Sequence, residues 1–236
     1  MGCRFQKGLS LGVNNELIDI IKEMKLHLGC GERYLDGYLN VDFPSTEHTI
    51  QKTSVADEHA DISELKYEKS SIDEIRLHHV FEHFDRAQAC GLVAAWHRCL
   101  RDGGILHIEV PDFFRTMIAY LSPFTTFHEK MIGIRHIFGS QEASWAVHFD
   151  GYDSSRFKNM LGLFGFEIIE TKKNSWMGTY NIEIIARKKD KIFSEDDYYE
   201  AAKMYLCQFC IDESKTEKRM LEVWLNNFKT QLNKNQ

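Results

Sequence analysis

A short glycine turn and an isolated carboxylate lie close together near the start of the chain. An apolar run enters Gly29-Cys30-Gly31, and a second short apolar run ends at Asp42. Glycines let the backbone approach a ligand closely, and a carboxylate at the end of a neighbouring strand accepts hydrogen bonds from ribose hydroxyls. This arrangement predicts a site for a nucleotide-like cofactor.

The glycine pattern argues against NAD as that cofactor. A dinucleotide fingerprint has a third glycine, and here Arg33-Tyr34 occupies that part of the turn. The distance from Gly31 to Asp42 is also much shorter than the roughly 20 residues usual for that fold. The motif therefore favours S-adenosylmethionine (SAM), and an NAD-dependent oxidoreductase is the weaker alternative.

Strands and helices that could position these residues alternate along the chain. Short apolar runs predict strands, apolar residues at helical spacing predict helices, and Asp85 is a suitable N-cap for one of them. The expected strands are 25–28, 38–41, 61–62, 72–78, 105–110, 166–171 and 181–187. The expected helices are 86–100, 113–121, 127–138, 154–164, 198–211 and 220–232. This alternation, with a terminal hairpin through 172–180, predicts an α/β doubly wound sheet that carries one antiparallel strand.

The chain divides into three parts. Residues 1–24 form an expected N-terminal helical lead-in, residues 25–189 an α/β domain, and residues 190–236 a helical C-terminal extension. Residues 112–147 form an irregular insert in the α/β domain. The C-terminal helices either pack on the core or provide a surface for a homodimer or another partner.

Several motifs in this order are similar to those of the class I SAM-dependent methyltransferases, especially the small bacterial type 11-like members. They are His27-Leu28-Gly29-Cys30-Gly31, Asn40-Val41-Asp42, Asp61-Ile62, His79-Val80-Phe81-Glu82-His83, Leu100-Arg101-Asp102-Gly103-Gly104 and Val110-Pro111-Asp112. The resemblance covers residues 25–187. It implies a Rossmann-like seven-stranded sheet in the order 3-2-1-4-5-7-6, with the last strand antiparallel.

The resemblance also assigns cofactor-binding roles by position. The residues that it implies are Gly29, Cys30 and Gly31 for the methionine and ribose portion of SAM, Asp42 for the ribose hydroxyls, Asp61 with Ile62 for the adenine, and His78 with His79 for the amino-acid end. All follow strands at their carboxyl ends, where ligands of open α/β sheets bind.

The acceptor side of the reaction has weaker signals. Histidine titrates near neutral pH, so His83 and His148 are candidate general bases, with Asp112 as a third. Arg115 in the insert and Tyr152 after it are candidate substrate-binding residues. Aromatic and basic residues together suit a polar small molecule, and the resemblance favours a sugar- or phosphate-bearing metabolite or a surface-glycan intermediate, methylated on oxygen.

Two further alternatives stay open. The segment from His79 to His83 matches H-x-x-E-H, so a zinc-dependent hydrolase could use His79 and His83 as ligands and Glu82 as base. A non-catalytic SAM-fold subunit that binds a partner is the other alternative. Cys207-Gln208-Phe209-Cys210 is a lone C-x-x-C, and we interpret it as two packed helical cysteines.

The overall composition restricts the classes of partner that the protein is expected to bind. The chain has 236 residues, 43% hydrophobic and 27% charged residues, six cysteines and a net charge of −6. An acidic protein does not suit general nucleic-acid binding, and no apolar stretch reaches the roughly 18 residues of a membrane span. With no disulfide-framework spacing and no apolar signal segment at residues 1–6, the expected location is the cytoplasm.

Overall fold

The computed structural model describes residues 23–44, 46, 50, 53–189 and 192–235. Nearly all of the expected lead-in, residues 1–24, lies outside the described residues. The central element is a seven-stranded sheet in the order β3-β2-β1-β4-β5-β7-β6, which confirms the expected order. β7 pairs antiparallel with both β5 and β6, and the other pairs are parallel. The strands are β1 (Lys25–Leu28), β2 (Leu39–Asp42), β3 (Glu58–His59), β4 (Ile72–His78), β5 (Leu100–Pro111), β6 (Phe166–Trp176) and β7 (Thr179–Lys188).

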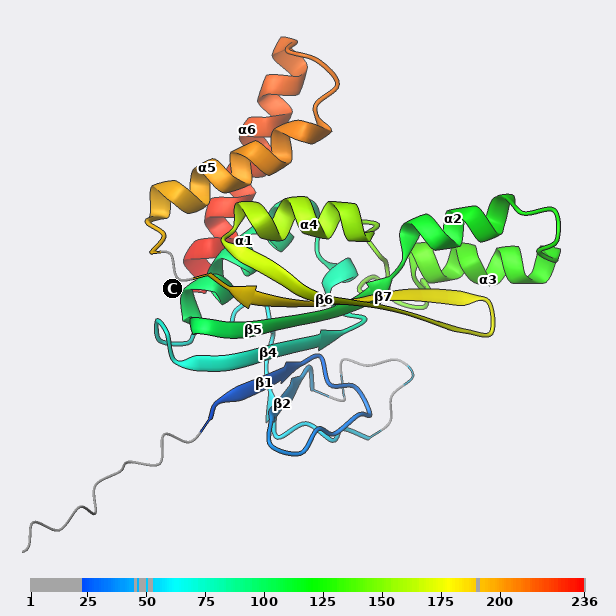
Figure 1. The fold of residues 1–236 in the computed structure, drawn as a ribbon, viewed down its shortest axis with the longest axis horizontal. Coiled ribbons are helices and arrows are strands. Elements are labelled where there is room, and N and C mark those ends of the chain that lie inside the picture. Colours follow the sequence, from blue (N-terminus) through cyan, green and yellow to red (C-terminus); the bar gives the residue numbers. More distant parts are fainter. Residues whose placement is uncertain (1–22, 45, 47–49, 51–52, 190–191, 236) are drawn as a thin grey trace, which may run out of the picture.

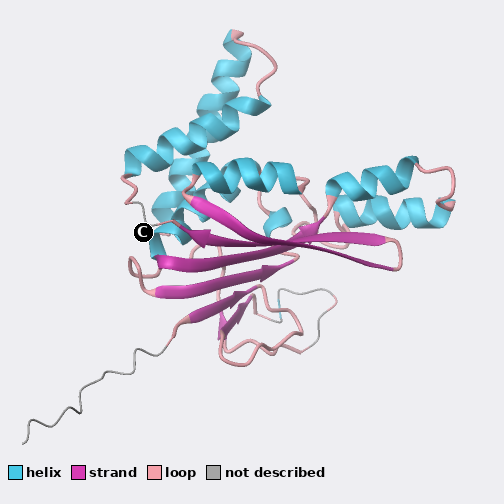
Figure 2. Ribbon diagram, viewed as in Figure 1, coloured by secondary structure: helices cyan, strands magenta, loops and turns pink. Residues whose placement is uncertain are grey.

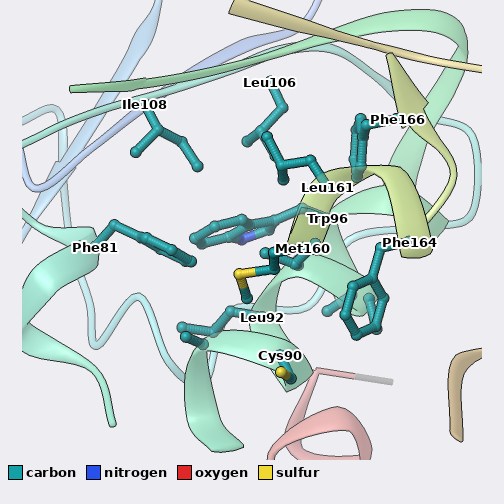
Figure 3. Close-up of a cluster of buried hydrophobic side chains, with 14 of the residues drawn as sticks. Phe81, Cys90, Leu92, Trp96, Leu106, Ile108, Met160, Leu161, Phe164 and Phe166 are labelled. Carbon is teal, nitrogen blue, oxygen red and sulfur yellow. The ribbon is translucent and has the colours of Figure 1, made fainter. Parts of the chain in front are cut away.

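Helices cover one face of this sheet (Figure 1). α1 (Arg86–Cys99) connects β4 to β5, and α4 (Ser154–Leu163) precedes β6. Asp85 caps α1 as expected, because its carboxylate accepts hydrogen bonds from the backbone N–H of Ala87 and Gln88. Trp96 of α1 packs in the core beneath Leu106 and Ile108 of β5 (Figure 3). This apolar layer holds the carboxyl ends of the central strands in fixed positions.

The opposite face of the sheet is polar. His27, Arg76 and His107 lie side by side on β1, β4 and β5, because the register pairs His27 with Arg76 and Arg76 with His107. In a sheet with helices on both faces, both sets of side chains are usually apolar. Among the described residues, α1, α4, α5 (Glu195–Leu206) and α6 (Lys215–Lys234) all lie on the other face (Figure 1).

The third strand and the terminal hairpin differ from the sequence-based expectation. β3 is Glu58–His59, and Asp61-Ile62 follows it in a turn. The hairpin was expected to be a loop through 172–180, but β6 and β7 pair as far as Trp176 and Thr179. Figure 2 shows this hairpin extending past the other strands towards two helices, α2 (Phe113–Leu121) and α3 (Phe127–Phe138).

The C-terminal helices pack on the core. α6 carries Leu225, Phe228 and Leu232, which are buried in the main hydrophobic cluster, while α5 contributes Tyr205 and Leu206. A short 3-10 turn, η3 (Cys207–Phe209), separates α5 from the loop before α6. Core packing, the first of the two expected roles, is thus observed, and homodimerisation through these helices stays a prediction.

Candidate active site

A cavity of about 400 Å³ lies at the carboxyl ends of β1, β2 and β4. Its lining residues are Gly29, Gly31, Asp42, Phe43, Asp61, Ile62, Ser63, His79, Val80, His83, Phe84, Gln88, Trp145 and Phe149. A second cavity, of about 540 Å³, is next to the amino ends of β1 and β2 and contains none of the predicted site residues. Ligands of parallel α/β sheets bind at the carboxyl ends, so the first cavity is the candidate site.

The glycine turn forms one wall of this cavity. Gly29 has φ +67° and Gly31 has φ +56°, a backbone conformation that favours glycine. The backbone N–H groups of Gly29 and Cys30 donate to the carbonyl of Val41, at 2.8 and 3.2 Å. These bonds fix the turn against β2 and place its backbone beside the cavity.

Asp42 lies next to this turn with its carboxylate buried at the cavity wall. One oxygen accepts a hydrogen bond from Gly31 N–H at 2.7 Å, and the other accepts from Phe43 N–H at 2.8 Å. Cys30 is buried nearby but does not line the cavity. Burial and the charge of Asp42 raise the pKa of the Cys30 thiol to about 11, so this thiol stays neutral and packs rather than reacts.

Asp61 and Ile62 line the cavity from the turn after β3. Asp61 accepts a hydrogen bond from Ser63 N–H at 2.8 Å, which orients its carboxylate. The expected strand at 61–62 was wrong, but the predicted residues still reach the cavity, because β3 ends only two residues earlier.

The two histidines at the end of β4 have different surroundings. His78 is on the polar face of the sheet, where Arg76 Nε donates to its Nε2 at 2.9 Å and Arg33 is 3.0 Å from its Nδ1. Burial and these two cations lower the pKa of His78 to about 3. His78 does not line the cavity, and its contact with the cofactor stays a prediction.

His79 lines the cavity with a strained backbone. Its φ is +53°, an uncommon value for a residue with a side chain, and its backbone N–H donates to the Glu109 carbonyl at 2.9 Å. Such strain costs on the order of 1–3 kcal/mol and often occurs at functional sites. Nδ1–H of His79 donates to the Glu82 carboxylate at 3.2 Å.

The H-x-x-E-H segment forms a single 3-10 turn, η2 (Phe81–His83), rather than part of an α-helix. Phe81 anchors this turn in the core, where its ring contacts Tyr152 and Trp96. His79 and His83 are therefore not placed one turn apart on an α-helix, as the zinc-hydrolase alternative expects. Among the described residues, the group whose ligand atoms lie close enough to hold a metal contains His83 but not His79.

A cluster of imidazoles surrounds Glu82 instead. We call His79, His83, His136 and His148 the histidine cluster; the His83 and His148 ring centroids are 4.6 Å apart, and those of His79 and His136 are 5.7 Å apart. Burial alone would raise the pKa of Glu82, but the hydrogen bond from His79 and the nearby imidazoles outweigh it, and the net shift is downward. Burial lowers the pKa of His148.

Aromatic side chains that the sequence did not identify as site residues complete the walls. Phe43, Trp145 and Phe149 all line the cavity, and each is more than a third exposed. Phe43 directly follows Asp42, and this position next to a predicted cofactor-binding residue could have identified it from the sequence. Trp145 and Phe149 flank His148, in a segment that drew attention only for its histidine.

Three predicted acceptor-side residues have structural roles. Asp112 is buried and caps α2 by accepting from Arg115 N–H at 3.0 Å. Arg115 donates to the Asn174 carbonyl at 2.9 Å, on the β6–β7 hairpin. Tyr152 is 1% exposed in the core. None of the three lines the cavity, and their catalytic or substrate-binding roles stay predictions.

The comparison with models of known protein families agrees with the observed order of the strands in the sheet. Residues 26–108 match a family model described as a methyltransferase domain. This segment contains the glycine turn, Asp42, the turn after β3 and η2, on the sheet order expected for such enzymes. Residues 26–108, about a third of the chain, are thus similar to a methyltransferase domain.

Solved structures share the fold of this chain at low sequence identity. A chain in a complex between the Haloferax volcanii Trm112 methyltransferase activator and its candidate methyltransferase is 11% identical, with a TM-score of 0.51, over 73% of this chain and 85% of that chain. A SAM-dependent methyltransferase from Methanosarcina mazei is 14% identical, with a TM-score of 0.46, over 72% and 94%. The Burkholderia thailandensis 1,6-didemethyltoxoflavin N1-methyltransferase, with its substrate and S-adenosylhomocysteine bound, is 14% identical, with a TM-score of 0.46, over 71% of each chain.

The search of curated proteins found no match to this sequence. Within the part of the chain that the structure describes, none of the helices has the length and apolar character needed to cross a lipid bilayer.

Proposed function

We propose that this chain is a methyltransferase, which binds SAM in the cavity at the ends of β1, β2 and β4 and methylates an oxygen of a polar small molecule there. One observation carries the proposal: residues from four segments far apart in the sequence line the same cavity, namely Gly29 with Gly31, Asp42, Asp61 with Ile62, and His79. When bound, SAM supplies a methyl group activated by its positively charged sulfur.

The cofactor residues fit this role chemically. The turn from Gly29 to Gly31 gives a cofactor close access to the backbone, and Asp42 offers a fixed carboxylate for ribose hydroxyls. Asp61 and Ile62 are suited to the adenine, as a hydrogen-bond acceptor and an apolar contact. His79 is proposed for the amino-acid end of the cofactor.

The acceptor is proposed to lie between the histidine cluster and the aromatic wall. Trp145 and Phe149 offer flat apolar surfaces, and His83 offers a polar group on the same cavity. A sugar ring has both kinds of surface, so a sugar- or phosphate-bearing metabolite, or a surface-glycan intermediate, suits these walls. His83 and His148 are the proposed proton acceptors, a role that typically contributes about 10²–10⁴-fold to rate.

The insert 112–147 is proposed to shape this acceptor side. Its last part brings Trp145 to the cavity, and the carbonyls of Trp145 and Val147 hold the His83 ring at 3.0 and 3.1 Å. α2 and α3 lie further out, against the β6–β7 hairpin (Figure 2). The cavity is thus closed by the end of the insert rather than by its helices.

Calorimetric titration with S-adenosylhomocysteine tests the proposal. We expect micromolar binding, no binding of NAD, and a loss of at least tenfold in affinity for Asp42→Ala, since removing a buried charged hydrogen-bond partner costs about 1.5–3 kcal/mol. Asp36→Ala, an exposed acid in the β1–β2 loop, is the matched control and is expected to bind normally. Absence of S-adenosylhomocysteine binding by the unmodified protein would overturn the proposed cavity.

A further inference from the structure

Glu82 is a buried carboxylate that is only partly satisfied by its neighbours. The residue is 1% exposed, and its Oε1 accepts the hydrogen bond from His79. No described residue donates a hydrogen bond to Oε2, although this oxygen is fully buried. A buried anionic oxygen without a partner is costly, so a cationic ligand at this point would compensate for its loss of hydration.

His83 keeps one ring nitrogen available for a ligand. Its Nδ1 lies 3.0 Å from the Trp145 carbonyl and 3.1 Å from the Val147 carbonyl. Carbonyl oxygens only accept, so Nδ1 must carry the proton and Nε2 keeps its lone pair. A histidine held in this way, with Nδ1–H on a backbone carbonyl and Nε2 available, is typical of metal ligands.

His148 supplies the third ligand group. Its Nε2 is 4.0 Å from Glu82 Oε1, its Nδ1 is buried without a partner among the described residues, and it lies edge-on to His83. One ligand atom from each of Glu82, His83 and His148 lies within 4.8 Å of the other two. The backbone is fixed there as well, because Phe149 N–H donates to the Glu82 carbonyl at 2.9 Å.

We propose that Glu82, His83 and His148 bind a divalent transition-metal ion, with Zn²⁺ as the first candidate. Two imidazoles and one carboxylate are a ligand set for zinc or ferrous iron, whereas Ca²⁺ and Mg²⁺ prefer oxygen ligands throughout. The set differs from the H-x-x-E-H alternative, because His79 only orients the carboxylate and His148 takes its place as ligand.

The site opens towards the methyltransferase cavity, which gives the ion an entry path. His83 lines that cavity, while Glu82 and His148 lie behind it. An ion here would keep a coordination position facing the cavity. If the proposed function holds, an acceptor hydroxyl bound at that position would release its proton to solvent more readily, which is how bound metals activate oxygen nucleophiles. The ion would then take over this role from His83 and His148, because it occupies their lone pairs.

Cobalt substitution tests the site without any assay of methyl transfer. Protein treated with a chelator and then dialysed is titrated with Co²⁺ and followed by visible absorption and by metal analysis. We expect d–d bands that saturate at one equivalent and disappear when Zn²⁺ is added. Since removing even an outer partner of a metal site weakens binding by about 10–100-fold, His83→Ala and His148→Ala are each expected to weaken cobalt binding at least tenfold.

Matched variants separate this site from other metal-binding groups. His128→Ala changes an exposed histidine on α3, and Cys207→Ser changes the exposed cysteine of the lone C-x-x-C; both are expected to keep the bands. Loss of the cobalt bands in Cys207→Ser would overturn the site, and so would bands that persist in both His83→Ala and His148→Ala. Binding of less than a tenth of an equivalent of Co²⁺ by the unmodified protein would also overturn it.

Calorimetry with S-adenosylhomocysteine on the chelator-treated protein distinguishes the two proposals. If the protein binds S-adenosylhomocysteine but not Co²⁺, only the metal site is rejected. If it binds Co²⁺ but not S-adenosylhomocysteine, only the cofactor cavity is rejected. Normal ligand binding by His148→Ala also shows that this variant is folded, so its loss of cobalt binding is attributable to the missing ligand.

Discussion

Gly29 and Gly31 share a positive φ, but a methyl group would meet different surroundings at the two positions. A Cβ on Gly29 would lie 2.3 Å from Val80 Cγ2, while a Cβ on Gly31 would meet nothing within 4 Å. Val80 directly precedes η2 and lines the cavity. Gly29 is therefore required for packing and backbone conformation together, and Gly31 for conformation alone.

Alanine substitutions at these positions are expected to differ in their effect on stability. Gly31→Ala carries only the left-handed backbone cost of about 1–2 kcal/mol, whereas Gly29→Ala adds a collision with Val80. Urea unfolding of both variants measures the difference. Equal losses in the free energy of unfolding at the two positions would contradict the role assigned to Val80.

Local sequence predicted the cofactor side of the site better than the acceptor side. Gly29 and Asp42 each follow a short apolar run, so their positions at strand ends were visible in the sequence, whereas Asp61 follows a polar stretch. Tyr152 was chosen because it lies between the insert and a predicted helix, but it is buried against Phe81, which is far away in the sequence. Contacts of this kind depend on tertiary packing, which a single sequence does not reveal.

α6 fills the space beside α1 through close contact at one glycine. A Cβ on Gly91 would lie 2.6 Å from Gln231 Cβ, and Phe228 is 1% exposed next to it. The Gln231 side chain also donates to the Ser63 carbonyl, on the loop that follows Asp61. The C-terminal extension thus supports the segment that carries part of the cavity.

Phe228→Ala is expected to lower the free energy of unfolding by about 3–5 kcal/mol, because it leaves a cavity in a packed interface. Val223→Ala, on the exposed side of the same helix, is the control and is expected to change it by less than about 0.5 kcal/mol. Denaturant unfolding followed by circular dichroism gives both values. A loss below about 1 kcal/mol for Phe228→Ala would show that α6 is only loosely attached.

The sequence predicts the type of an element well where its hydrophobic periodicity extends over many residues. The bounds of α2 and α3 are those expected from apolar spacing, since each helix has an uninterrupted pattern. The expected strands, 166–171 and 181–187, are shorter than β6 and β7, because residues 172–180 were assigned to the connection of the hairpin. Backbone pairing across the hairpin continues through this stretch without needing apolar side chains, so hydropathy alone underestimates the strands.

Buried neutral imidazoles give the whole molecule a pH-dependent stability. Burial lowers the pKa of His97 to about 3, and the pKa values of His27 and His107 are also lowered by burial. In the unfolded chain a histidine titrates near 6.5. The unfolded chain therefore binds more protons below this pH, and stability falls as the pH decreases.

His97→Asn tests this linkage between pH 7 and pH 4. Each extra proton bound by the unfolded chain corresponds to a slope of about 1.4 kcal/mol per pH unit, so the variant is expected to lose stability less steeply on acidification. His128→Asn, which changes an exposed histidine, is expected to keep the original slope. The same slope in His97→Asn as in the unmodified protein would assign the acid sensitivity to other groups.

The uneven distribution of helices around the sheet has a consequence for the order in which the chain folds. β4, α1 and β5 are consecutive in the sequence, as are α4, β6 and β7, so their contacts close short loops. β1, β2 and β3 are joined by loops, with no α-helix among the described residues between Leu28 and Ile72, and β1 reaches the rest of the sheet only through β4. We expect β4 to be the template on which these strands assemble last, so the cofactor cavity is completed only after the hydrophobic core exists.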